Sequence, residues 1–145
     1  MKLILILLGC LHGVAAFAGN AVISCPPSID VIEQPTQIAG WITYQEQTPY
    51  FFVFAQFSDG PPALQQTLMH HKESRSGKDK VLHYFFSPPQ EPWVICSYFD
   101  TKTTLARKLP TATRTCQITL DHMHNFQTVK EIRCNSDASF HQSSK

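Results

Sequence analysis

Four cysteines that follow an N-terminal apolar segment constrain this chain of 145 residues more than any other feature. They are Cys25, Cys96, Cys116 and Cys134, while a fifth, Cys10, lies inside the apolar segment. An even number of cysteines in an exported chain indicates two disulfide bonds. A four-thiolate zinc site is disfavoured, because such sites use closely spaced C-x-x-C pairs and the sequence has none.

Residues 1–18 have the pattern of a secretory signal peptide, with Lys2 before an apolar run and Ala16-Phe17-Ala18 at the expected cleavage site. A lipoprotein signal ending at Cys10 is disfavoured, because the apolar run continues past it. The run is shorter than the roughly 20 residues of a spanning helix, so we expect no membrane span. We expect one domain over residues 19–134 and a flexible polar tail over 135–145, in a periplasmic or secreted protein.

The charge balance narrows the choice of partners. The chain has 12 Lys and Arg against 11 Asp and Glu, and Lys2 is the one charged residue of the predicted signal, so the exported part is neutral. Nucleic acids and anionic membrane surfaces need a basic excess, so neither is expected as the main partner.

The cysteine positions favour one of the three possible pairings. Residues 116–120 and 129–134 have the pattern of two hairpin arms around a loop at 122–128, which places Cys116 opposite Cys134. Cys25 then bonds Cys96 and ties the N-terminal segment to a central strand.

Short β-branched and aromatic runs between turn residues predict an all-β fold, a small antiparallel sandwich or barrel. Residues 50–57 predict a central strand with Phe51 and Phe57 on one face and Phe52 on the other. Residues 63–69 fit either a helical turn or a bent edge strand, and residues 70–80 predict an exposed loop. The other predicted strands are residues 29–32, 41–46, 81–86, 93–99 and 103–109.

Catalytic signatures are missing from the sequence: there is no G-x-S-x-G, no H-E-x-x-H and no phosphate-binding glycine loop. We therefore expect no enzyme, no catalytic residue and no cofactor. His122 and His124 are weak candidates for zinc or copper, with His70 and His71 as a further ligand source, but surface loop positions explain them better and no metal is expected.

The loops offer the candidate residues for binding a protein partner: Asp59 in the turn at 59–62, and His71, Arg75 and Lys78 in the predicted loop at 70–80. A basic loop can steer an acidic partner, although a solvated connection explains it better. The loop at 122–126 is a third region for mutation.

Several motifs together resemble a family of small secreted proteobacterial proteins, some of them encoded near type VI secretion loci. The motifs are Cys25-Pro26-Pro27, Trp41, the Phe57-Ser58-Asp59-Gly60-Pro61-Pro62 turn, Trp93-x-x-Cys96-x-Tyr98, Leu109-Pro110 and Ile132-Arg133-Cys134. The chain departs from the family pattern at residues 83–86, where many relatives have a tryptophan, and in its histidine-containing tail.

The resemblance implies an exported, disulfide-bonded β domain with no catalytic residues to transfer. It also implies an immunity role for some members, in the periplasm, against a secreted antibacterial effector that attacks the cell wall. We therefore expect a non-enzymatic binding protein that neutralises a protein partner. The alternative is an envelope accessory module that binds a small ligand or metal through its histidines.

Overall fold

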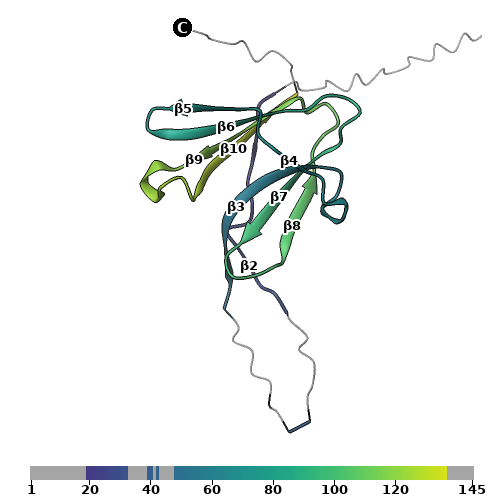
Figure 1. Cartoon of the computed structure of the whole chain (residues 1–145), viewed down its shortest axis with the longest axis vertical. Helices are drawn as coiled ribbons and strands as arrows, with labels where there is room; N and C mark the ends of the chain where they lie inside the picture. Colours follow the sequence, from purple (N-terminus) through teal and green to yellow (C-terminus); the bar gives the residue numbers. More distant parts are fainter. Residues whose placement is uncertain (1–18, 33–38, 41, 43–47, 137–145) are drawn as a thin grey trace, which may run out of the picture.

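The chain folds into a sandwich of two antiparallel β-sheets, each five-stranded (Figure 1). The structure, a computed structural model, describes residues 19–32, 39–40, 42 and 48–136. It confirms the all-β prediction and decides between its two forms, because the strands make two separate sheets and not a closed barrel.

The first sheet, called sheet A here, has the strand order β1-β10-β9-β6-β5. Its strands are β1 (Ala21–Ile23), β5 (Lys72–Ser76), β6 (Asp79–Phe85), β9 (Thr115–Leu120) and β10 (Val129–Asn135).

The second sheet, sheet B, has the order β2-β3-β7-β8, with β4 also pairing with β3. Its strands are β2 (Ser28–Ile29), β3 (Tyr50–Asp59), β4 (Thr67–Leu68), β7 (Pro92–Tyr98) and β8 (Thr104–Lys108). Two 3-10 turns, η1 (Pro62–Leu64) and η2 (His122–His124), complete the secondary structure of the described residues.

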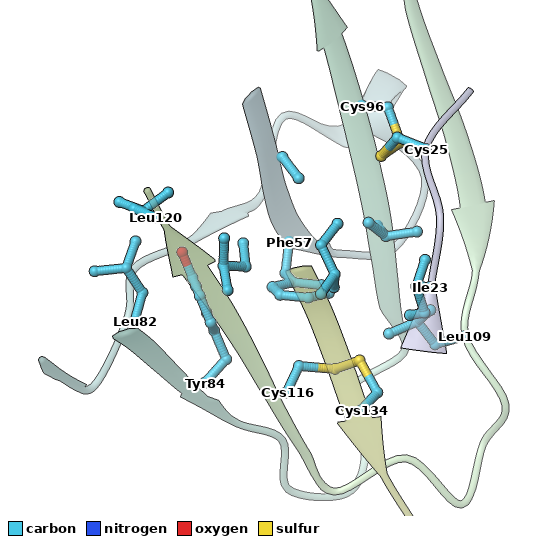
Figure 2. Packing of buried hydrophobic residues seen from close by; sticks show 14 of the residues in the cluster. Ile23, Cys25, Phe57, Leu82, Tyr84, Cys96, Leu109, Cys116, Leu120 and Cys134 are labelled. Carbon is cyan, nitrogen blue, oxygen red and sulfur yellow. A yellow bond between two sulfur atoms is a disulfide. The ribbon is translucent and has the colours of Figure 1, made fainter. Parts of the chain in front are cut away.

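Phe57 is the centre of the core between the two sheets (Figure 2). Its side chain on β3 is fully buried and packs edge-on against Tyr84 and Phe86 of the opposite side, at ring-centroid distances of 4.8 and 5.5 Å. Ile118 of β9 and Val94 of β7 are also almost fully buried. Burial of such side chains is the main favourable contribution to folding.

Both predicted disulfides form, Cys25–Cys96 and Cys116–Cys134 (Figure 2). Cys116 and Cys134 lie directly opposite each other on β9 and β10, as the hairpin prediction required. Cys25 lies between β1 of sheet A and β2 of sheet B, and its bond to β7 fixes the segment that passes from one sheet to the other.

The prediction of which β3 side chains point toward the core is wrong for the first half of the strand. Phe51 was expected to share the face of Phe57, but it is 63% exposed, and Phe52 packs against the core instead. The cause is a register shift between Phe52 and Phe54 against β7, which places an extra residue, Val53, in the strand. One extra residue reverses the alternation of side chains on the N-terminal side of the bulge.

The predicted loop at 70–80 is also wrong, because it is a hairpin: β5 pairs with β6 through a two-residue turn at 77–78. Gly77 takes a positive φ of 61° in that turn. The sequence contains no sign of this strand because β5 has no apolar residue. An edge strand whose side chains are mostly exposed needs none. The ambiguous residues 63–69 form η1 followed by β4, and the strand expected at 29–32 is limited to Ser28–Ile29.

Several expectations fall wholly or mostly outside the described residues. These are the signal peptide at 1–18, the strand at 41–46 apart from Ile42, and the tail from residue 137 onward. Asn135, expected in the tail, is instead the last residue of β10 and pairs with Thr115. Within the described part of the chain, no helix has the length and apolarity needed to cross a bilayer.

Removing each disulfide separately should lower the free energy of unfolding by different amounts, because the two bonds close loops of different length. The Cys25–Cys96 bond spans 71 residues and the Cys116–Cys134 bond spans 18. The chain-entropy relation then predicts losses of about 4 kcal/mol for Cys25→Ala/Cys96→Ala and about 3 kcal/mol for Cys116→Ala/Cys134→Ala. Guanidinium titration of both double variants measures these free energies of unfolding, and a larger loss for the shorter loop would contradict the expectation.

Candidate functional site

The turn at residues 77–78 and the loop at residues 121–128 lie side by side at one end of sheet A, and are together called the distal tip (Figure 1). Asp79, the first residue of β6, joins them. Its Oδ1 accepts hydrogen bonds from the backbone N and the Nδ1 of His122, at 3.2 and 3.0 Å. Its Oδ2 accepts from Nζ of Lys130 on β10, at 2.8 Å.

These bonds set the charge state of Asp79. The residue is only 9% exposed, and hydrogen bonds from Lys130 and then from His122 hold the pKa of its carboxyl well below the ordinary value of 3.8. The same carboxylate raises the pKa of Lys130. A carboxylate and an ammonium therefore stay charged and paired across three strands at the base of the tip.

Asp121 shapes the loop itself. It precedes η2, and its Oδ1 accepts from the backbone N of Met123 at 2.9 Å, which caps the short turn. Its Oδ2 accepts from Nδ1 of His124 at 2.9 Å. The Met123 N–H and then His124 lower the pKa of Asp121, so it too is a charged acceptor.

Phe126 closes the loop against the hairpin. Asn125 and Phe126 both have positive φ, at 51° and 61°, a conformation that L residues adopt only at a cost in free energy. The cations of Arg75 and Lys80 lie 5.9 and 5.8 Å from the Phe126 ring centroid, within reach of a cation–π interaction. The surrounding side chains thus hold a strained loop in one shape.

The tip brings together four of the seven residues singled out from the sequence: Arg75, Lys78, His122 and His124. His70 instead lies against Glu73 of β5, with Nε2 3.0 Å from its carboxylate. Between His122 and His124, Met123 is 75% exposed and projects an apolar side chain from a charged surround. A surface held in one shape can present Met123 to a protein partner.

Asp59 and His71 lie away from the tip. The carboxylate of Asp59 accepts from the backbone N of Glu91 at 2.8 Å, and therefore joins the end of β3 to the residue before β7. His71 precedes β5, at the opposite end of that strand from the tip, and its Nδ1 accepts from the backbone N of Phe85 at 3.3 Å.

Sequence reasoning missed the carboxylates around His122. Asp79, Asp121 and His122 have potential ligand atoms within 4.8 Å of one another, although Asp79 is 43 residues away in the chain. Asp121 directly precedes His122, so local spacing could have revealed it, but not Asp79, because β6 and β10 are both neighbours of β9 only in the folded sheet. The Asp79 carboxylate is already bonded to the Lys130 ammonium, which occupies the position where a cation would be attracted.

Ser74 on β5 and His83 on β6 form a serine–histidine pair away from the tip. Ser74 Oγ lies 2.6 Å from Nε2 of His83, a distance typical of a nucleophile and its base. The side-chain amide of Gln117 on β9 lies 3.2 Å from Nδ1 of the same ring, so His83 also contacts the next strand. Burial and Lys72 lower the pKa of His83. Ser74, His83 and Gln117 thus connect β5, β6 and β9 through their side chains.

Comparison with known proteins defines the class of this sandwich. A model of the type VI secretion system Tli immunity protein family matches residues 46–135. An uncharacterised 16.3 kDa protein encoded in the 5′ region of trpG in Azospirillum brasilense is 32% identical over 117 residues, covering 73% of this chain and 78% of that protein. No solved structure matches the chain.

The chain belongs to the type VI secretion system Tli immunity protein family. This finding confirms the resemblance to small secreted proteins encoded near type VI secretion loci.

Asp79→Asn should lower the free energy of unfolding at neutral pH, because the amide loses the charge that Lys130 and His122 bond to. The Asp79 pKa is depressed, so its contribution is fully present above the ordinary value of 3.8 and is lost as the pH falls below it toward the folded-state pKa. Urea titrations of the wild type and the variant should therefore converge on acidification. Asp100→Asn, in an exposed turn, is the control, and a difference that widens in acid would contradict the assignment.

Proposed function

We propose that this protein is a periplasmic, non-enzymatic immunity protein that binds and neutralises a type VI secretion effector. One observation carries the proposal: the family match spans residues 46–135, which includes every strand from β3 to β10. The two disulfides support a location outside the cytoplasm, since such bonds persist in oxidising compartments.

The family supports a lipase-class effector, which acts on membrane lipids, in place of the cell-wall toxin implied by the earlier resemblance. The alternative of a metal or ligand module is not favoured, because the Asp79 carboxylate that lies beside His122 is already paired with the Lys130 ammonium.

The distal tip is the surface that we propose for effector contact. Its shape is fixed before binding by the Asp79 and Asp121 bonds and by the packing of Phe126, so little conformational entropy is lost on association. Met123 supplies an apolar anchor, and the two segments of the tip also carry the polar residues Lys78 and His124. This combination of a central apolar contact and a polar rim resembles the energetic centre of known interfaces.

The neutralisation test uses a lipase-class type VI secretion effector, directed to the periplasm of a sensitive host. Co-expression of the full chain should restore growth and keep membrane phospholipid intact, whereas an unrelated disulfide-bonded periplasmic protein should not. If the full chain binds no such effector and protects against none, the proposed function is wrong.

A matched pair of methionine variants tests the surface. Met123→Asp should weaken effector binding by about tenfold or more, because it places a charge at the centre of the contact. Met69→Asp makes the same change at a residue that is 76% exposed, against 75% for Met123, but that lies between β4 and β5, outside the tip. Calorimetry with purified effector should show loss of affinity for Met123→Asp alone; equal affinities would remove the tip from the interface.

A further inference from the structure

Strand β5 is an outer edge of sheet A, paired with β6 on one side only (Figure 1). Four of its five residues are exposed, and Ser74 is half-buried. The strand contains no proline, and within Lys72–Ser76 its pairing with β6 has no register shift. Such an edge presents unpaired backbone groups to which another strand can bond.

The turn at 77–78 determines which backbone groups face outward. In a two-residue hairpin the flanking pair, here Ser76 and Asp79, is bonded in both directions, and so is every second pair from it. Lys72, Ser74 and Ser76 therefore bond toward β6. The N–H and C=O groups of Glu73 and Arg75 face the open edge.

The charges on these two residues make the edge complementary to itself. When a second β5 runs antiparallel with the two-fold axis at Ser74, Glu73 of each copy lies opposite Arg75 of the other, with backbone bonds in both directions. An axis at Glu73 places two glutamates opposite each other, and an axis at Arg75 places two arginines opposite each other. Opposite charges stabilise a cross-strand pair and like charges destabilise it, so only one register is favoured.

The other described edges lack this property. Strand β8, the free edge of sheet B, carries Arg107 and Lys108 and no acidic residue, so two copies of it would bring only like charges together. Strand β1 has three residues, and β2 and β4 have two each.

We propose that β5 is an interface between two copies of this chain, which joins their five-stranded sheets into one continuous sheet across a two-fold axis. Pairing of one short strand buries less surface than a stable dimer needs, so the dimer is weak and depends on concentration. The loop at 121–128 follows β9, two strands in from this edge, and remains open on each copy. The proposal is independent of the proposed effector.

Charge exchange provides the test. Sedimentation velocity of the full chain, with its disulfides intact, should show a reversible monomer–dimer equilibrium between about 10 µM and about 1 mM. Glu73→Arg or Arg75→Glu alone should raise the dimer dissociation constant by about tenfold or more, because each places like charges opposite each other twice. The double variant Glu73→Arg/Arg75→Glu should restore dimerisation. Arg107→Glu, the same charge change on β8, should leave it unchanged.

Three outcomes would overturn the proposal. The first is a wild-type chain that stays monomeric over the whole concentration range. The second is a dimer that the single variants leave intact, which would place the contact elsewhere. The third is a double variant that remains monomeric while its circular dichroism matches the wild type, which would show that the pairing of Glu73 with Arg75 does not specify the contact.

Discussion

The link between Cys25 and Cys96 is the constraint on which the rest of the structure depends. Cys25 lies where the chain passes from sheet A to sheet B, and its bond reaches the central strand β7. Two residues further along β7, the Tyr98 hydroxyl donates to the Pro26 carbonyl at 3.1 Å. A covalent bond and a hydrogen bond thus fix the same crossing segment, which holds the two sheets in one relation while Phe57 and Tyr84 pack between them.

Sheet A holds its distal tip in place because a disulfide fixes the strands at the opposite end of the sheet. At the core end β9 and β10 are joined by Cys116–Cys134, and at the tip the same two strands separate into the loop at 121–128. There hydrogen bonds between charged groups replace apolar packing, and the Asp79 carboxylate accepts hydrogen bonds from Lys130 and His122. Hydrogen bonds keep the tip polar and hold it in one conformation, which a binding surface requires.

Local patterns predicted much of this architecture. The cysteine spacing predicted both disulfides, and the apolar runs predicted β3, β6, β7, β8, β9 and β10 to within two residues. The failures have a common cause, which is that pairing between distant strands overrides local composition. Strand β5 has no apolar residue to mark it, the extra residue in β3 is defined only by its register against β7, and Asp79 meets His122 only through the order of the sheet.

Arg75 shows how one edge residue can serve two requirements. Its guanidinium covers Phe126 and so helps to hold the strained loop, while its backbone N–H and C=O face the open edge. Glu73 beside it bonds Lys80 at 3.2 Å on the neighbouring strand. Charged side chains on an edge strand normally discourage sheet extension. Here the spacing of Glu73 and Arg75 places opposite charges together in one pairing register and like charges together in others. The edge can therefore pair with a second β5 in one arrangement and is protected against the rest.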